Sequence, residues 1–165
     1  MELRWWGEFF SVHWGDLASV ASLVIASITL WVAKKAREAA EGARELAKRR
    51  NLAEELQELQ NKIEQVGIFL RDNKWDLVHL RAQEIVGGCS TLPSRWKKEL
   101  SAESRGNIIL AREQVRSIAA VALRAPRTPP QARELRQVER AQQRAHELLS
   151  GELGVSLVSI EGPEA

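Results

Sequence analysis

The sequence has few of the residues on which catalysis and metal binding depend. Its one cysteine, Cys89, excludes a disulfide within the chain, which suits a protein whose bulk lies in the reducing cytoplasm. The three histidines, His13, His79 and His146, are scattered along the sequence, and the chain has no second cysteine. A metal site is therefore not expected. No glycine pattern matches the G-x-G-x-x-G or G-x-x-x-x-G-K-[ST] loops of nucleotide-binding proteins. We therefore predict no enzyme, no catalytic residue, no cofactor and no metal.

Charged residues are also missing from residues 17–33, LASVASLVIASITLWVA. This run is slightly shorter than a usual membrane span, but Trp14 and Trp31 would lie about 25 Å apart on a helix, close to the spacing of the two aromatic belts of a bilayer. The alternatives are a buried helix of a soluble domain, which would show a polar face, and a signal peptide, whose positive charges precede its apolar run. We predict a transmembrane helix over residues 16–33, anchored by Trp14, Leu17, Leu23, Ile25, Ile28 and Trp31.

The charges on either side of this run differ in sign. Residues 1–16 sum to −2, residues 34–50 to +4 and residues 51–165 to 0. Because positive charge stays on the cytoplasmic side, we place the N-terminus outside and the C-terminal part in the cytoplasm. Residues 1–15 are rich in tryptophan and phenylalanine, which indicates an aromatic tail at the membrane interface, with Asp16 capping the helix.

Small residues recur every four positions in the apolar run, at Ala18, Ser22 and Ala26. Such a face lets two membrane helices approach closely, and we predict self-association through it.

The helix is predicted to continue through a basic juxtamembrane segment, residues 34–50, to about Arg71, since only Gly42 and Gly67 interrupt strong helix formers. An apolar stripe of alternating three- and four-residue spacing runs along its second part. The stripe either pairs with a copy of itself or packs on later helices of the same chain. We predict that it contributes to oligomerisation, with Leu52, Leu56, Leu59, Ile63, Val66 and Leu70 as its members.

Three further helices are predicted. The second lies between a turn at Asp72-Asn73 and the glycine pair Gly87-Gly88, and the third starts at a Ser101 cap and ends at Pro126. The fourth starts at a Thr128 cap and ends at Gly151. Their stripes are Trp75, Val78, Ala82 and Ile85, then Ile108, Ala111, Val115, Ile118 and Ala122, then Leu135, Val138, Gln142, Ala145 and Leu149.

The expected fold is therefore all-α, with one N-terminal transmembrane helix that runs into a long juxtamembrane helix and an antiparallel bundle of about four helices behind it. The bundle occupies residues 51–150. Residues 151–165 form a C-terminal tail, in which residues 155–160 are a short strand or a clamp across the bundle.

Arginine is concentrated between Arg105 and Arg144, where nine arginines face three glutamates. Within this region one helix face carries Arg133, Arg136, Arg140 and Arg144, a set suited to an acidic protein or an anionic ligand. The alternative is that these side chains neutralise acidic residues of the same chain. Nucleic acid is the less favoured partner, because no aromatic residue lies among the arginines to stack on bases.

Residues 14–50 open with the run WGDLASVASLVIASITLWVAKKAREAAEGAREL. They resemble the opening of small bacterial single-span membrane proteins, most of which are uncharacterised. In those proteins a basic Ala/Glu/Arg-rich juxtamembrane helix precedes a helical cytoplasmic module. The resemblance implies a location in the bacterial inner membrane and carries over no catalytic residue.

Three functions are consistent with these features. The first is a non-enzymatic membrane-anchored module that self-associates and recruits or senses a cytoplasmic partner. The second is an effector whose oligomerised spans perturb or permeabilise the membrane when the cytoplasmic module binds a ligand. The third, less favoured, is a soluble nucleic-acid binder.

Overall fold

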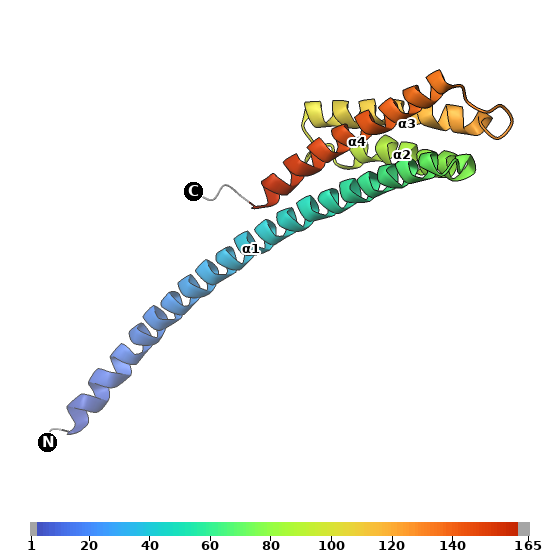
Figure 1. Cartoon of the computed structure of the whole chain (residues 1–165). Coiled ribbons are helices and arrows are strands. Elements are labelled where there is room, and N and C mark those ends of the chain that lie inside the picture. The colour runs from blue at the N-terminus through green and yellow to red at the C-terminus, as the bar shows by residue number, and fades with distance from the viewer. Residues whose placement is uncertain (1–2, 162–165) are drawn as a thin grey trace. The chain divides into compact units, whose positions relative to one another are not determined.

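The described part of the chain is all-α. The computed structural model describes the backbone of residues 3–161 and the side chains of residues 19–158 and 160. Within these residues there are four helices and no strand (Figure 1). The helices are α1 Leu3–Arg71, α2 Trp75–Arg95, α3 Ala102–Arg124 and α4 Ala132–Glu161.

The chain divides into two compact units, Met1–Glu45 and Leu46–Ala165. The first contains the N-terminal part of α1. The second contains the rest of α1 together with α2, α3 and α4, and we call it the C-terminal unit.

The first helix begins earlier than the sequence predicts. Asp16 lies inside α1, so its assignment as the N-terminal cap is wrong, and the aromatic residues 3–15 belong to the helix and not to a separate tail. No proline lies between Leu3 and Asp16, and a glycine inside a helix costs only about 1 kcal/mol. The helix also continues through Gly42.

The predicted turn at Asp72-Asn73 is confirmed. Asn73 has a φ of 55°, in the left-handed region that asparagine tolerates better than most residues. The Lys74 N–H donates to the Phe69 carbonyl at 2.9 Å, and the Asn73 N–H donates to the Leu70 carbonyl at 3.2 Å. This is the Schellman pattern, which satisfies the last carbonyls of α1 and reverses the chain into α2.

One hydrophobic core joins the four helices of the C-terminal unit, in which α2, α3 and α4 lie beside the Leu46–Arg71 part of α1 (Figure 1). The predicted stripe of α3 is confirmed at every position, since all five side chains are buried. In α2 and α4 the same holds for Val78, Ala82, Ile85, Val138, Ala145 and Leu149, whereas Trp75, Leu135 and Gln142 are half-buried.

The apolar stripe of α1 belongs to this core. Leu56, Ile63 and Val66 have no exposed surface, Leu52 and Leu59 are almost as buried, and Leu70 is half-buried at the edge. The stripe therefore packs on later helices of the same chain, the second of the two alternatives. Its assignment as an oligomerisation surface is corrected, because side chains without solvent exposure cannot contact a second chain.

The second helix does not end at its glycine pair. α2 continues through Gly87 and Gly88 to Arg95 and contains Pro93 in its last turn. Neither glycine has the positive φ that ends a helix. Gly88 instead lets α1 approach, because a Cβ there would lie 2.6 Å from Cδ2 of Leu59.

Both ends of the fourth helix differ from the prediction. α4 begins at Ala132, four residues after Thr128, where the Glu134 carboxylate accepts a hydrogen bond from the Gln131 N–H at 3.0 Å. It passes through Gly151 to Glu161, so the expected strand or clamp over residues 155–160 is helical. The helix continues because Leu153 and Ile160 still pack against the core.

The third helix starts as predicted. The Ser101 hydroxyl accepts a hydrogen bond from the Ser104 N–H at 2.9 Å, and α3 stops at Arg124, before Pro126.

Two glycines in α2 provide a matched test of the α1–α2 contact. We expect Gly87→Ala to stabilise the protein by about 0.4–1 kcal/mol, since nothing lies within 4 Å of the added Cβ. We expect Gly88→Ala to lower the free energy of unfolding by about 1–3 kcal/mol, because Leu59 is buried and has to move. Urea denaturation followed by circular dichroism measures both. Equal stabilities of the two variants would contradict the packing of α1 on α2.

Candidate functional site

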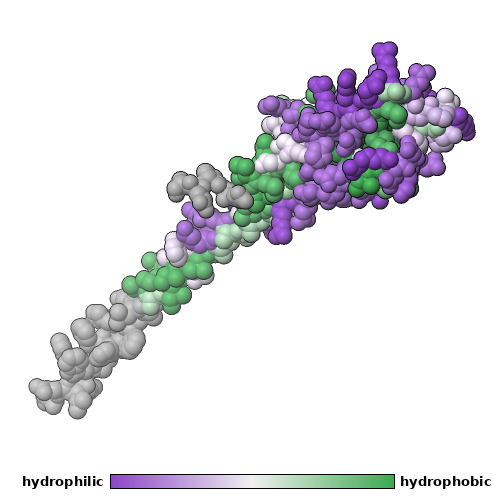
Figure 2. All heavy atoms as spheres, viewed as in Figure 1, coloured by the Kyte–Doolittle hydropathy of each residue, from purple (hydrophilic) through white to green (hydrophobic). Residues whose placement is uncertain are grey.

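The apolar segment of α1 is exposed along its whole described length. Leu23 is 71% exposed, Ile25 64%, Ile28 56% and Trp31 62%. Ser22 and Ala26 of the small-residue face are exposed as well, whereas the side chains of Trp14, Leu17 and Ala18 lie outside the described residues. Figure 2 shows this segment as a band of hydrophobic surface. A helix that is apolar on all sides and covered by no protein favours a lipid environment over water.

The polar side chains within this segment are compatible with lipid. The Ser27 hydroxyl donates to the Leu23 carbonyl and the Thr29 hydroxyl donates to the Ile25 carbonyl, both at 2.8 Å. Each hydroxyl is thereby satisfied within the helix and needs no water. By length and composition, α1 qualifies as a helix able to cross a membrane. None of its most apolar 18-residue window is buried by protein.

Charge returns directly after the apolar segment. Lys34 pairs with Glu38 at 4.0 Å and Arg37 with Glu41 at 2.9 Å, each one helical turn apart on exposed side chains. Such exposed pairs contribute at most about 0.5 kcal/mol each to helix stability. The main electrostatic feature of residues 34–50 is therefore their net positive charge.

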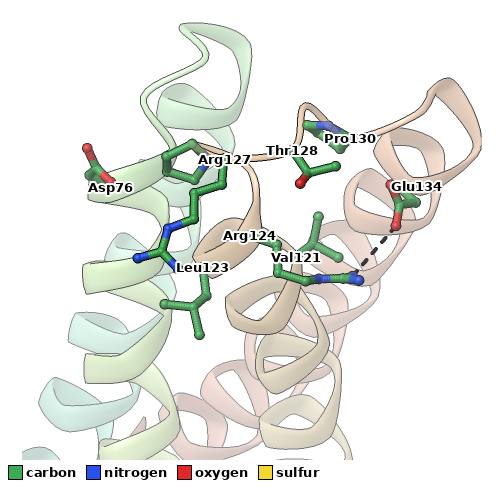
Figure 3. Close-up of a pocket in the computed structure, with 9 residues that line it drawn as sticks. Asp76, Val121, Leu123, Arg124, Arg127, Thr128, Pro130 and Glu134 are labelled. Carbon is green, nitrogen blue, oxygen red and sulfur yellow. Dashed lines mark ion pairs between the residues drawn. The ribbon is translucent and has the colours of Figure 1, made fainter.

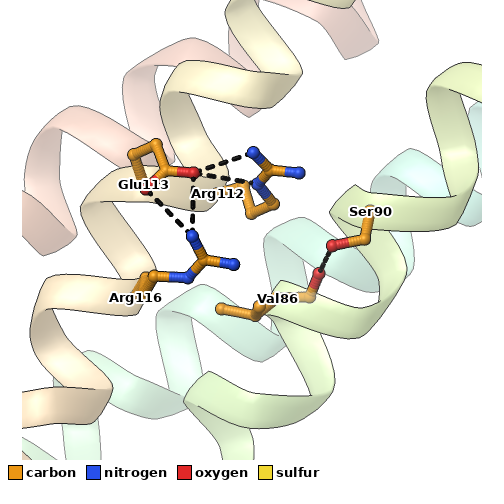
Figure 4. A network of polar contacts seen from close by, with 5 residues as sticks. All are labelled: Val86, Ser90, Arg112, Glu113 and Arg116. Carbon is orange, nitrogen blue, oxygen red and sulfur yellow. Dashed lines mark hydrogen bonds and ion pairs between the residues drawn. The ribbon is translucent and has the colours of Figure 1, made fainter.

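The arginines of α3 and α4 differ in whether they have partners. In α3 the Arg105 guanidinium donates to the Lys97 carbonyl, Arg112 and Arg116 pair with Glu113, and Arg124 pairs with Glu134. Figure 4 shows Glu113 held between its two arginines. In α4, by contrast, all four predicted arginines are exposed, and no ion pair or hydrogen bond of their side chains occurs within the described part of the chain; we call Arg133, Arg136, Arg140 and Arg144 the arginine row.

A groove lies beside the arginine row, between α3 and α4. Its volume is about 350 Å³, and it is lined by the row members Arg140 and Arg144 and by neutral side chains, with no carboxylate. The neutral residues are Gln114, Ser117, Val121, Gln137, Val138 and Ala141.

A larger pocket of about 600 Å³ lies where α2, α3 and the loop between α3 and α4 meet. Arg124, which reaches Glu134 across 3.6 Å, and Arg127 line it together with the carboxylates of Asp76 and Glu134 (Figure 3). Its charges are therefore balanced from within the chain. Sequence reasoning missed this pocket, because Asp76 lies far along the chain from its other lining residues, which fall within residues 121–134.

The single thiol of the chain is inert. Cys89 is fully buried in the core, and this burial raises its pKa to about 11, against an opposing effect of the nearby Arg112 charge. A thiol with such a pKa is almost entirely protonated at neutral pH and is a poor nucleophile.

The two histidines with described side chains make contacts between helices. His79 Nδ1 lies 3.1 Å from the Ala119 carbonyl oxygen, and His146 Nε2 lies 3.3 Å from a carboxylate oxygen of Glu64. No group of three or more His, Cys, Asp or Glu side chains within the described residues could hold a metal ion.

No family model, no curated protein and no solved structure matches this chain.

The reactivity of Cys89 tests its burial. At about pH 8, a shift of the thiol pKa from 9.0 to about 11 lowers the thiolate fraction by about 100-fold. We expect iodoacetamide to modify the folded protein at least 100-fold more slowly than the same protein in guanidinium chloride, as measured by mass spectrometry. Comparable rates in the two states would show that Cys89 is accessible.

Proposed function

We propose that the protein is a single-span membrane protein whose C-terminal unit acts in the cytoplasm as a non-enzymatic interaction module. The observation that carries the proposal is the segment of residues 19–33, which exposes apolar side chains on all sides and contains no charge. In water this surface would be unfavourable, at about 25 cal/mol for each Å² left exposed, whereas in the hydrocarbon core of a bilayer it is matched by its surroundings.

The proposed orientation rests on the charges beside the span. Residues 34–50 contain seven lysines and arginines, against one in residues 1–16. The C-terminal unit would then lie in the cytoplasm, where its single cysteine remains reduced. The resemblance of residues 14–50 to small bacterial single-span proteins suggests the inner membrane of a bacterium.

An interaction role for the C-terminal unit is supported by its chemistry. Its buried thiol has a raised pKa, its described histidines are engaged between helices, and the pocket of Figure 3 has balanced charges. Its four helices share one continuous core, and we infer from this that they form the antiparallel bundle that their short connections favour. A rigid bundle presents fixed outer surfaces to partners.

Self-association is part of the proposal and is assigned to the span. The stripe of α1 is occupied by the chain's own core, which leaves the face of Ala18, Ser22 and Ala26 as the candidate contact. Small side chains on such a face allow close backbone approach between membrane helices.

Membrane fractionation tests the anchor. We expect the full-length protein to stay in the membrane pellet after alkaline carbonate extraction and Ile25→Lys with Ile28→Lys to release it, because each lysine near the centre of a span costs about 3 kcal/mol on insertion. Leu77→Lys with Leu80→Lys is the matched control, since these two side chains are exposed on α2, and this variant should stay in the pellet.

Wild-type protein in the carbonate supernatant would overturn the anchor. A purified chain whose intact mass lacks the apolar segment would identify that segment as a cleaved signal sequence.

Cross-linking in isolated membranes tests self-association. We expect Ser22→Ile with Ala26→Ile to reduce the cross-linked oligomer several-fold, because the larger side chains separate the helix backbones. Val20→Ile with Val24→Ile adds bulk to the opposite face and should leave the oligomer unchanged. An equal effect of both pairs, or the absence of an oligomer in the wild type, would remove self-association through this face.

A further inference from the structure

We propose that the arginine row and the groove beside it bind an acidic helical segment of a partner protein. The proposal deepens the proposed function, since it names the class of partner that an interaction module at the membrane would recruit. Its starting point is the contrast between α3, whose four arginines all have acceptors, and α4, whose four arginines have none within the described residues.

The carboxylates of α4 do not neutralise the row. Glu134 is held by Arg124 and by the Gln131 N–H, Glu147 accepts a hydrogen bond from Gln143, and the buried Glu152 accepts one from Asn107 at 2.7 Å. Glu139 is exposed next to the row but forms no ion pair with it within the described part of the chain. The alternative that the arginines neutralise acidic residues of the same chain therefore receives no support from these contacts.

The geometry of the row fits a helix. Arg133 and Arg144 are eleven residues apart, so the row extends about 16 Å along α4, with guanidinium groups at spacings of three and four residues. A second helix with carboxylates at i, i+3, i+7 and i+11 repeats its charges at the same intervals. Each guanidinium fork can then pair with a carboxylate through two parallel hydrogen bonds.

The groove adds an apolar contact to this charge complementarity. Val121 of α3 is half-buried in its lining beside the arginines, whereas Val138 and Ala141 of α4 form its buried floor. An amphipathic helix can place an apolar side chain against Val121 while its acidic face pairs with the row.

The same features argue against nucleic acid as the partner. No phenylalanine, tyrosine or tryptophan occurs in α4, so bases have no aromatic platform to stack on. Residues 51–165 also have no net charge, and the long-range attraction that drives binding to a polyphosphate backbone is accordingly weak.

The other grooves of the C-terminal unit carry compensated charge. The groove between α1 and α2 contains Glu55, Glu58 and Glu84, but Arg95 pairs with Glu55, and Lys62 pairs with both Glu58 and Glu84. The pocket of Figure 3 combines two arginines with two carboxylates. Against these, the groove beside the arginine row presents positive charge without a carboxylate in its lining.

Fluorescence anisotropy with the full-length protein in detergent tests the proposal. The probe is a labelled helical peptide with glutamates at i, i+3, i+7 and i+11, and the same peptide with glutamines is its control. We expect the glutamate peptide to bind and to weaken as salt rises, because the contact is made by exposed charges. Three exposed ion pairs together change Kd by about tenfold, so Arg136→Gln/Arg140→Gln/Arg144→Gln should weaken binding by about that factor.

The matched control is Arg112→Gln/Arg116→Gln/Arg124→Gln, which removes the same charge from α3 and should change Kd by less than about twofold. The variant Arg140→Glu with Arg144→Glu reverses two charges of the row. We expect it to bind a lysine peptide of the same spacing more tightly than the glutamate peptide.

Equal affinity for the glutamate and glutamine peptides, or an equal loss in the α3 control, would overturn the proposal. Tighter binding of single-stranded RNA or of inorganic pyrophosphate than of the glutamate peptide would overturn it in favour of a phosphate ligand. The peptide-binding measurements are made in detergent, so their outcome does not depend on the outcome of the carbonate extraction. The variant with three row arginines replaced should stay in the membrane pellet, as the wild type is expected to.

Discussion

Burial of the α1 stripe is the contact around which the C-terminal unit is arranged. Leu56, Ile63 and Val66 lose all solvent exposure only because α2, α3 and α4 complete the core that encloses them. A stripe of this width, left on a lone helix, would expose apolar surface worth about 25 cal/mol for each Å². Polar contacts complement the core, since Trp96 donates to Glu55 at 3.1 Å and the Gln142 amide donates to the Ile63 carbonyl.

α1 illustrates how one type of secondary structure suits two solvents. In the C-terminal unit its apolar side chains form one face and its outer face is charged, as a helix at the surface of a protein requires. Over residues 19–33 the apolar side chains point to all sides, and the hydroxyls of Ser27 and Thr29 are bonded to carbonyls one turn earlier. The distribution of polar groups around the helix axis, and not the helical backbone, separates a surface helix from a candidate span.

Ion pairing within the C-terminal unit determines which of its surface charges remain uncompensated. Glu113 satisfies Arg112 and Arg116, and Glu134 is shared by Arg124 and the start of α4. The arginine row keeps its charge because Glu134, Glu147 and Glu152 of its own helix are engaged elsewhere, and Glu139 forms no ion pair with it within the described residues. An unpaired row of this kind contributes little to stability.

Periodicity and local signals of the sequence determined much of this structure: the helical class, the α3 stripe, the Ser101 cap, the Asn73 turn and the uncharged segment of residues 17–33 are all legible in the printed residues. Tertiary packing decided the rest. Spacing fixes which side chains share a face but not what covers that face, so only the fold assigned the α1 stripe to the chain's own core. A glycine commonly ends a helix by taking a positive φ, and neither Gly87 nor Gly88 has a positive φ in the packed α2. Likewise, Arg124 reaches Glu134 only because the fold brings the end of α3 beside the start of α4, whereas the arginine row has no carboxylate within reach in the described part of the chain.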